Sequence, residues 1–507
     1  KPLKILLFFM AVFMLLLGIA LVFPQDGIRL GSEAKLRFTS VGDLFGGGEQ
    51  VATGYTDSLI AQAVVSDDPE WIGEGALVLT DGQGTVPGGL NGALDHFGSR
   101  PDTLSLVPVV DTAWLQARLD SLVKIRIDSI RERVFPIAFS ERATKEFTSF
   151  LFVAGRAVDS GRVLRVLHYG DSQIENDRMT ALLRYRLQRI FGGSGVGMVP
   201  AIPLYSGNPA FTQAIDGDWT RYTGFGKRDT TLGHASYGTM ACFTAVPLPE
   251  EGWLPSLEFE FRQGRRASDF RRLRIFMHAC ADSGFVAIRL NDTIADTVLH
   301  VTGGYQELSV DLPVVPSKVR LEFGLAEGGR IYGISFDPLS GVQVDNIAMR
   351  GSSGLELSRL DRQVMDTMLK ALDPGLIIMQ FGGNMVPYVK NTSFYKRALK
   401  RELKYLKGLC PDIPVLVIGP SDMSVRRDGR YTTYETLEPV RDAMREAALE
   451  SGCAFWDMYE AMGGAQSIRN FVLADPPLAR PDHIHFTPRG ANLVAGMVFE
   501  AMAVEVE

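Results

Sequence analysis

The pattern of apolar and polar residues changes several times along this chain. Short apolar runs alternate with helical patterns at residues 161–206, and the same alternation returns at residues 340–507. Residues 207–339 instead carry short segments that alternate every second residue, with Gly, Pro and Asn-Asp turns between them. Residues 29–160 are irregular and rich in Gly, Asp, Ser and Pro until a helical pattern begins at about Asp111. We therefore expect separate segments with different folds.

The two α/β segments predict one domain that is split in sequence. The expected strands are 163–167, 342–349, 376–381, 414–419 and 453–457, and the expected helices are 177–190, 355–372, 393–407, 437–450 and 488–502. Apolar strands that alternate with helices are typical of a doubly wound parallel sheet. The predicted fold is therefore a flavodoxin-like five-stranded parallel sheet, made by residues 161–206 and 340–507.

The intervening segment 207–339 predicts an inserted β-sandwich of jelly-roll type. Its alternating strands are expected at 256–261, 272–277, 285–289, 307–311 and 318–323. Four aromatic residues in it have faces on which a sugar can stack: Trp219, Tyr222, Trp253 and Tyr305. Because aromatic residues of a sandwich more often pack in its core, we favour packing over sugar binding.

The N-terminus predicts a transmembrane helix. Lys1 and Lys4 precede an uncharged apolar run from Ile5 to Phe23, and such a run spans about 28 Å as a helix. A cleavable signal peptide is the alternative, but its exit site would be weak, so we favour an uncleaved anchor over residues 1–28. The basic end stays cytoplasmic, so we expect an inner-membrane anchor with the body in the periplasm or otherwise extracytoplasmic. The region 29–160 is expected to be a stalk followed by two amphipathic helices, broken near Pro136.

Composition narrows the choice of partners. The net charge is −7 with seven histidines and no basic block, so a nucleic-acid partner has no support. The four cysteines, Cys242, Cys280, Cys410 and Cys453, are scattered and indicate neither a zinc site nor a disulfide framework. A Cys242–Cys280 bridge is an alternative, but we favour unpaired buried thiols.

The loops at the carboxyl ends of the predicted strands carry polar residues in a definite order. They contain Gly170-Asp171-Ser172, then Gly351, then Gly382-Gly383-Asn384, and finally Asp482 and His485 before the last helix. This order resembles the four blocks of the SGNH (GDSL-like) hydrolase superfamily: a Gly-Asp-Ser turn, a glycine, a Gly-x-Asn and an Asp-x-x-His. The resemblance covers the split α/β domain but not residues 25–160.

The chemistry of these residue types fits acyl transfer without a metal or cofactor. Ser172 is the predicted nucleophile, and it needs a base, which we assign to His485. Asp482 can orient the imidazole and stabilise its charged form. Three donors can meet the oxyanion: the N–H of Ser172, the N–H of Gly351 and the side-chain amide of Asn384.

Some assignments have competitors. Asp171-Ser172 alone would suit a helix cap. His483 competes with His485, but the Asp-x-x-His spacing favours His485 and leaves His483 as an expected surface residue. Gly354 competes with Gly351, which we prefer because it follows its strand directly.

Three further residues lie beside the motifs. Asp422 at the end of the fourth strand either touches substrate or caps a turn. Gln173 and Met385 depart from the family pattern, which usually has leucine and aspartate at these positions. Both changes are expected to alter the mouth of the site and not its catalytic groups.

The resemblance also implies a substrate. The chain is similar to exported SGNH esterases that remove O-acetyl groups from cell-wall glycans, some of which have a carbohydrate-module-like β-domain inserted between their first and second blocks. We therefore expect removal of O-acetyl or other short acyl groups from a peptidoglycan or exopolysaccharide through an acyl-enzyme on Ser172. The alternatives are an O-acetyltransferase that works with a membrane-bound O-acyltransferase, and a non-catalytic glycan-binding envelope protein.

Overall fold

The structure is a computed structural model that describes residues 28–30, 34–36, 134–205, 207–291 and 297–505. The chain divides into two compact units, residues 1–55 and 56–507. In the first unit, β1 (Ile28–Leu30) and β2 (Ala34–Leu36) pair as an antiparallel hairpin.

Most of the predicted N-terminal features lie outside the described residues. These are the apolar run of the expected membrane anchor, residues 5–23, and the helical pattern at 111–133. No helix within the described ranges is long and apolar enough to cross a membrane.

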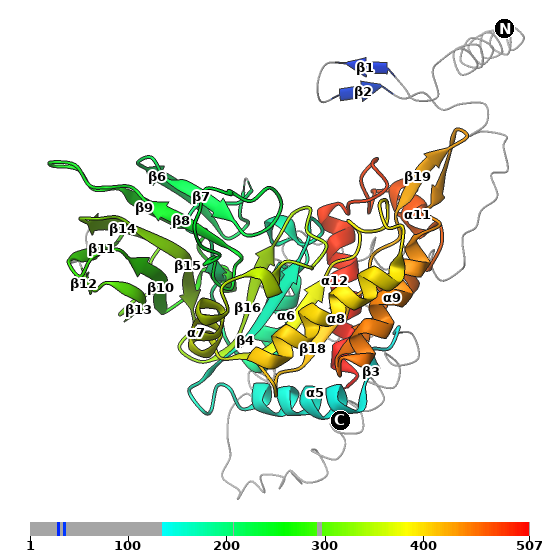
Figure 1. Cartoon of the computed structure of the whole chain (residues 1–507), viewed down its shortest axis with the longest axis horizontal. Coiled ribbons are helices and arrows are strands. Elements are labelled where there is room, and N and C mark those ends of the chain that lie inside the picture. The colour runs from blue at the N-terminus through cyan, green and yellow to red at the C-terminus, as the bar shows by residue number, and fades with distance from the viewer. Residues whose placement is uncertain (1–27, 31–33, 37–133, 206, 292–296, 506–507) are drawn as a thin grey trace, which may run out of the picture. The chain divides into compact units, whose positions relative to one another are not determined.

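The second unit contains the predicted parallel sheet (Figure 1). In spatial order its strands are β16 (Gly341–Ala348), β4 (Val163–Gly170), β17 (Pro374–Gln380), β18 (Val415–Ile418), β21 (Ala454–Trp456) and β3 (Ala138–Phe139). The first five are parallel and have the order 2-1-3-4-5 along the chain, while β3 is antiparallel. The α/β prediction is therefore confirmed, and β3 is an edge strand that the sequence pattern did not reveal.

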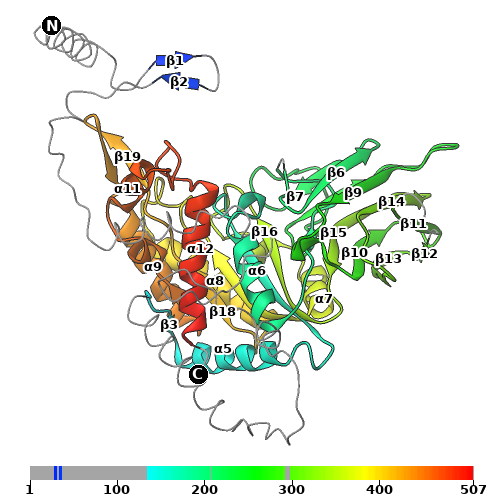
Figure 2. The same cartoon turned by 180° about the vertical axis from the view of Figure 1, so that it is seen from behind.

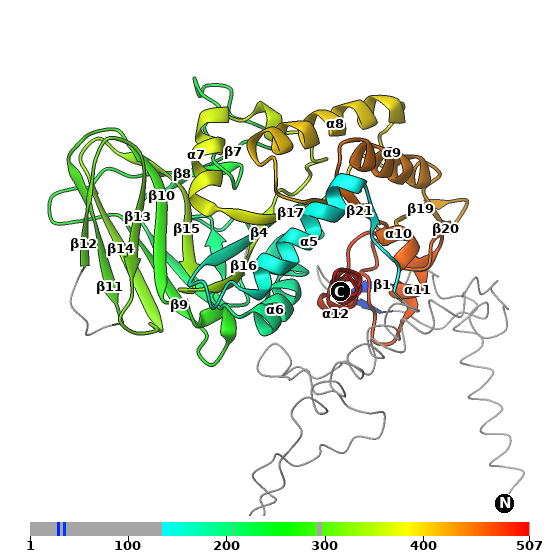
Figure 3. The same cartoon turned by 90° about the horizontal axis from the view of Figure 1, so that it is seen from below.

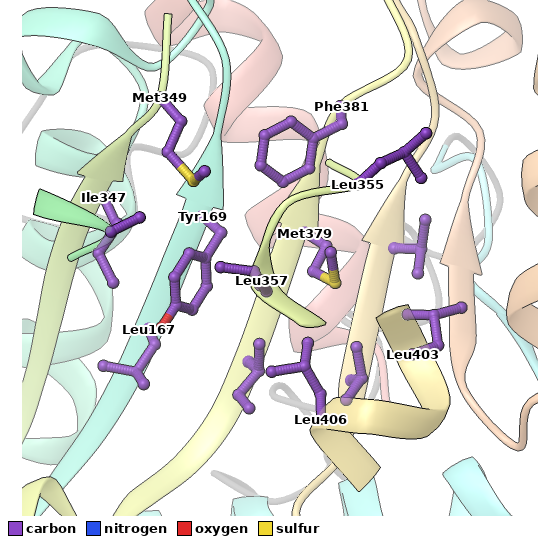
Figure 4. Close-up of a cluster of buried hydrophobic side chains, with 14 of the residues drawn as sticks. Leu167, Tyr169, Ile347, Met349, Leu355, Leu357, Met379, Phe381, Leu403 and Leu406 are labelled. Carbon is purple, nitrogen blue, oxygen red and sulfur yellow. The ribbon is translucent and has the colours of Figure 1, made fainter. Parts of the chain in front are cut away.

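Helices cover both faces of this sheet (Figures 1 and 2). One face carries α7 (Arg362–Leu372), α8 (Thr392–Leu409) and α9 (Leu437–Glu450). The other face carries α5 (Glu141–Gly155), α6 (Thr180–Phe191), α11 (Ser467–Leu473) and α12 (Pro488–Ala503). The short helix α10 (Met458–Ala461) follows β21. Alternate residues of β4 point to opposite faces of the sheet and pack in two separate cores. Val166 packs on the α5–α12 side, while Leu167 and Tyr169 pack on the α7–α9 side. Figure 4 shows the second of these clusters.

Two helices begin later than predicted. The helix expected from residue 177 begins at Thr180, after a short 3-10 helix, η3 (Glu175–Asp177), in which Asp177 has a left-handed φ of 63°. The helix expected from residue 355 begins at Arg362, because the Asp361 side chain caps it there after a second 3-10 helix, η5 (Leu357–Arg359).

Residues between α6 and β16 form two antiparallel sheets (Figure 3). One sheet contains β13 (Gly304–Asp311), β10 (Arg272–Ala279), β15 (Gly329–Asp337), β8 (Cys242–Val246) and β7 (Thr220–Thr223), with β5 (Gly197–Val199) also paired to β15. The other contains β12 (Thr297–Val301), β11 (Gly284–Leu290), β14 (Lys318–Leu325), β9 (Ser256–Phe261) and β6 (Phe211–Asp216).

The two antiparallel sheets enclose one core and thus form a β-sandwich. Ile275 and Phe336 from the first sheet and Phe259 and Leu321 from the second are all fully buried in it. β5 departs from the expected organisation, because it lies in the stretch assigned to the hydrolase domain and yet pairs with sandwich strand β15.

The aromatic residues that could have stacked on a sugar are mostly used in packing. The Tyr222 ring stacks on Phe243 with their centroids 4.9 Å apart. Trp219, Trp253 and Tyr305 are all partly buried. Packing, which we favoured, accounts for Tyr222, Trp219 and Tyr305, which contact the buried cores.

The cysteines are unpaired, as predicted. Cys242, Cys410 and Cys453 are free and buried. Cys280 is free but exposed, because it directly follows the end of β10. The expectation of burial was therefore wrong at Cys280.

The sandwich and the parallel sheet share a core. Phe243, Phe276 and Tyr332 of the first antiparallel sheet pack in the same cluster as Met365 and Met368 of α7. The sandwich is therefore packed directly against the α/β domain and does not hang from a linker.

A buried ion cluster strengthens this junction. Arg165 of β4 is fully buried and donates to both carboxylate oxygens of Asp345 on β16, at 2.8 and 2.7 Å. It also pairs with Asp337 of sandwich strand β15 and donates to Ser335 at 3.1 Å. One side chain thus joins two strands of the parallel sheet to the sandwich.

Candidate active site

Ser172, His485 and Asp482 form one hydrogen-bonded relay at the carboxyl edge of the parallel sheet. Ser172 Oγ lies 2.8 Å from His485 Nε2, and His485 Nδ1 lies 2.8 Å from Asp482 Oδ2. The serine and histidine are 313 residues apart in sequence, so only the fold brings them together. This is the arrangement of a nucleophile, a general base and a group that orients the base.

The Asp482 carboxylate is held in place by its own turn. Its Oδ1 accepts the backbone N–H groups of Ile484 and His485, each at 3.0 Å. Partial burial raises the pKa of Asp482, but the hydrogen bonds from the His485 side chain and from the two backbone N–H groups prevail and hold it at about 2. Asp482 therefore stays ionised throughout the neutral range and fixes the tautomer in which His485 Nε2 faces the serine.

Ser172 lies in a loop and not at a helix end. β4 ends at Gly170, and α6 begins only at Thr180, with Met179 as its N-cap residue and no side-chain capping bond. Neither Asp171 nor Ser172 therefore caps α6, so the helix-cap interpretation of the motif is wrong. The side chain of Ser172 is partly exposed and available to a substrate.

Two of the three expected oxyanion donors have free N–H groups. Within the described residues, the backbone N–H groups of Ser172 and Gly351 make no hydrogen bond. The competing Gly354 instead donates its N–H to Ser352 Oγ at 2.9 Å. The structure thus favours Gly351 over Gly354, because an oxyanion donor must be unoccupied in the free site.

The third expected donor, Asn384, is already engaged. Its Nδ2 donates to Ser352 O at 2.9 Å and to Asp171 Oδ2 at 3.2 Å. To meet an oxyanion, this amide must give up the longer bond to Asp171. Gly382 places the loop: its φ is +108°, and a Cβ there would lie 2.5 Å from Met444 Sδ, so only glycine fits.

Asp171 is a site residue that the sequence motif contained but to which we assigned no role. It is buried, and its carboxylate accepts the N–H of Gln173 at 3.0 Å as well as the Asn384 amide. Burial raises the pKa of Asp171 to about 6, although hydrogen bonds and the nearby His485 and Arg178 lower it in part. Asp171 thus couples the serine loop to the Asn384 loop through a group that titrates near neutral pH.

Gln173 joins the serine loop to the histidine loop. Its Nε2 donates to Ile484 O at 2.7 Å, next to His485 in sequence, and to Ser421 Oγ at 3.3 Å. A leucine here would make neither bond. Met385, the other departure from the family pattern, is partly buried against the core of the α7–α9 face.

Of two neighbouring residues, His483 differs from expectation, and Asp422 had two possible roles left open. His483, expected at the surface, is buried and stacks on Tyr431 with centroids 3.6 Å apart. The reason is an unpredicted hairpin, β19 (Ser424–Arg427) and β20 (Arg430–Thr433), that covers it. Asp422 is buried and accepts the N–H of Ile468 at 2.9 Å, so its role is structural.

No metal site accompanies the relay in the described part of the chain, where no group of three or more His, Cys, Asp or Glu side chains is placed to hold an ion.

The comparisons with known proteins agree with this geometry. Residues 329–493 match the model of the GDSL-like Lipase/Acylhydrolase family, a stretch that contains Gly351, Asn384, Asp482 and His485 but not Ser172. The α/β domain is an SGNH (GDSL-like) hydrolase domain. The protein is accordingly an ester hydrolase of the SGNH class.

One of the solved structures that match this chain shares its fold over most of the length. A peptidoglycan O-acetylesterase superposes with a TM-score of 0.60 at 19% sequence identity, over 72% of this chain and 97% of that one. A salicylyl-acyltransferase from a tetracycline biosynthetic pathway gives a TM-score of 0.25 at 12% identity, over 59% of this chain and 98% of that one. A family two carbohydrate esterase from Cellvibrio japonicus gives 0.23 at 8% identity, over 58% and 99%. Only the first value supports a common fold. No curated protein matches the sequence.

Proposed function

We propose that this SGNH hydrolase removes O-acetyl groups from an extracytoplasmic glycan, with Ser172 as nucleophile, His485 as general base and Asp482 as the group that orients it. The observation that carries the proposal is the relay of two 2.8 Å contacts from Ser172 through His485 to Asp482. The free N–H group of Ser172 and that of Gly351, on the loop after β16, supply the oxyanion donors.

The proposed reaction has two halves. Ser172 Oγ attacks the acetyl carbonyl while His485 Nε2 takes its proton, and the carbonyl oxygen becomes an oxyanion held by the two N–H groups. The C–O bond to the sugar then breaks, and His485 returns the proton to the departing sugar hydroxyl. Water attacks the acetyl-serine with His485 again as base, releasing acetate and regenerating Ser172.

The openness of the relay supports a large substrate with a small acyl group. The side chains of His485 and Asp482 are 30% and 44% exposed, so a glycan that presents an acetyl group from its surface can reach them. A deeply enclosed site would exclude a polymer.

The extracytoplasmic location in this proposal rests on the sequence. The apolar run Ile5–Phe23 behind Lys1 and Lys4 would hold the body outside the inner membrane. A glycan of the envelope is then the acetylated material within reach, and the solved peptidoglycan O-acetylesterase with the same fold makes peptidoglycan the first substrate to assay.

Hydrolysis assays on the full chain test the proposal. We expect acetate release from 4-nitrophenyl acetate and from O-acetylated peptidoglycan, and a loss of at least about 10³-fold in kcat for Ser172→Ala. Ser309→Ala, an exposed serine on sandwich strand β13, is the matched control and should keep full activity. Undiminished turnover by Ser172→Ala, with both variants folded by circular dichroism, would refute the assignment.

The same assay separates hydrolysis from transfer. A de-acetylated oligosaccharide is added as acceptor, and the products are analysed by mass spectrometry. The proposal requires free acetate as the main product at every acceptor concentration. Acetylated acceptor in place of acetate would instead identify an O-acetyltransferase.

A further inference from the structure

Two arginines that the proposed mechanism does not use flank the serine–histidine pair. Arg178 donates through Nη2 to the backbone carbonyl of Ser172 and through Nε to Glu175 O at 2.9 Å. Arg480 lies on the other loop, where its backbone N–H donates to His485 O at 2.8 Å. One arginine is therefore attached to the nucleophile's loop and the other to the base's loop.

Neither side chain has a carboxylate partner within the described residues. Arg350 nearby pairs with Glu175, and Arg184 pairs with Asp177. Arg178 and Arg480 make no salt bridge there. Arg480 is exposed and Arg178 is partly exposed, so both can be reached from solvent.

The charges of Arg480 and Arg350 both act on Arg178. Burial lowers the pKa of Arg178, and the charges of Arg480 and Arg350 lower it further, although Glu175 and Asp171 oppose them. The chain as a whole has a net charge of −7, so this cationic group does not reflect the average composition. Like charges held together at a site favour an anion between them.

We propose that Arg178 and Arg480 bind a carboxylate of the glycan, so that the preferred substrate is an acetylated acidic sugar. The inference rests on the proposed function and names its substrate class. A guanidinium matches a carboxylate with two parallel N–H donors. The guanidinium of Arg480 makes no hydrogen bond within the described residues, so both of these donors are available. Arg178 still has Nη1 available after its two backbone contacts.

The carboxylate takes no part in the chemistry. It fixes the sugar so that the acetyl ester faces Ser172, and this positioning raises kcat/KM for acidic substrates alone. Because both arginines are near solvent, the preference is weakened by added salt. The carboxylate can belong to a uronic acid ring or to the lactic acid ether of a muramyl sugar whose carboxyl carries no peptide.

Four substrates test the inference on the full chain: 4-nitrophenyl acetate, an O-acetylated neutral xylo-oligosaccharide, an O-acetylated oligo-uronate of equal length, and an O-acetylated muramyl oligosaccharide. We expect wild type to prefer at least one acidic glycan over the neutral one by about tenfold in kcat/KM. A preference for the uronate identifies a ring carboxylate, and a preference for the muramyl compound identifies a lactyl carboxylate.

Arg480→Gln should lower the acidic-to-neutral ratio of kcat/KM about tenfold, mainly through KM. Arg178→Gln should lower the same ratio, but it should also reduce turnover of the aryl acetate because it releases the Ser172 carbonyl. Arg156→Gln, which removes an equal charge from the exposed end of α5, is the control and should keep the wild-type ratio.

An unchanged ratio in Arg480→Gln, or no preference by wild type, would overturn the inference while leaving the proposed function intact. If wild type hydrolyses none of the four esters, the proposed function is overturned instead.

Discussion

At the residue scale, Asp482 has a role in the relay that depends on its being a carboxylate. One carboxylate accepts three N–H groups, two from the backbone and one from the His485 ring. Asp482→Asn replaces the acceptor facing Nδ1 with an amide, so the ring turns or adopts the tautomer that leaves no base at Nε2. We expect kcat on 4-nitrophenyl acetate to fall on the order of 10³-fold with little change in KM.

The pKa of Asp482 decides the pH dependence of this effect. Because that pKa is about 2, the aspartate remains ionised at every pH above about 4. The advantage of wild type over Asp482→Asn in kcat should therefore persist down to pH 5, where the carboxylate is still ionised. A ratio that collapses towards one at pH 5 would contradict the role given to Asp482.

The raised pKa of Asp171 predicts that its contribution to stability falls as the pH rises. Its pKa is raised from 3.8 to about 6 in the folded protein, so the folded state binds the proton more tightly than the unfolded state. Its stabilising contribution is full below about pH 4 and is lost as the pH rises through 6, a change on the order of 3 kcal/mol.

Asp171→Asn removes this titration. Urea unfolding of wild type and Asp171→Asn at pH 4.5 and 7.5 measures it, and the advantage of wild type should shrink at the higher pH. Burial also raises the pKa of Asp422 to about 6. Because Asp422 is present in both proteins, its contribution to the pH dependence of stability cancels in the comparison. An advantage of wild type that grows with pH would refute the account.

Local motifs made several site residues predictable. Ser172 follows closely after the end of β4, and the Asp482–His485 spacing places a carboxylate on the same turn as the imidazole. The engagement of Asn384 by Asp171 was not predictable, because it depends on how two distant loops meet. The same holds for the burial of His483 under Tyr431.

At the scale of elements, the site is an assembly of loops that are tied to one another by polar side chains. Gln173 ties the loop after β4 to the loop before α12 through the carbonyl of Ile484. Gln173→Leu keeps the apolar volume but loses this bond, so His485 should sit less firmly against Ser172. We expect kcat for 4-nitrophenyl acetate to fall about tenfold, with KM and the product of the reaction unchanged.

Gln173→Glu keeps the side-chain length and serves as the comparison. It replaces the donor with an acceptor facing the Ile484 carbonyl, so its kcat should fall at least as far as that of Gln173→Leu. Full activity in both variants would show that the loops are held together by other contacts.

The elements themselves were predictable to different degrees. The strands of the parallel sheet are apolar throughout because they are buried on both faces, so their pattern was strong. The start of α6 was missed because Asp177 pairs with Arg184 in a left-handed conformation, a tertiary contact with no local signature. The β19–β20 hairpin was missed because it is short and rich in arginine, which is unfavourable for recognising a strand.

At the scale of the whole second unit, the inserted sandwich is a rigid part of the enzyme. Arg165 joins β4, which leads to Ser172, to Asp337 of the sandwich. Arg165→Ala would leave the buried Asp345 without a counter-charge and Asp337 with only its 3.8 Å pair to Arg274. We expect the free energy of unfolding to fall by about 3–5 kcal/mol.

The shared core gives this prediction a second part. Because the α/β domain and the sandwich pack in one cluster, circular dichroism and tryptophan fluorescence should report one coincident transition in urea. Arg162→Ala, which breaks an exposed pair with Asp373, is the control and should cost less than about 1 kcal/mol. Equal losses in the two variants would contradict the role of the buried cluster.

The sequence pattern indicated the sandwich but predicted too few of its strands. Only the strands with clear two-residue alternation were predicted, whereas β15 is buried along nearly its whole length and lacks that alternation. Its contacts with β10, β8 and β5 depend on the assembled fold.

The central claim is that Ser172 forms an acyl-enzyme. The most direct test is to mix the full chain with 4-nitrophenyl acetate, quench in acid within the first turnovers, digest, and locate the acetyl group by mass spectrometry. We predict one acetyl group on the peptide that contains Ser172, formed in wild type and absent from Ser172→Ala. An acetyl group on another residue, or turnover without any acetylated serine, would contradict the account.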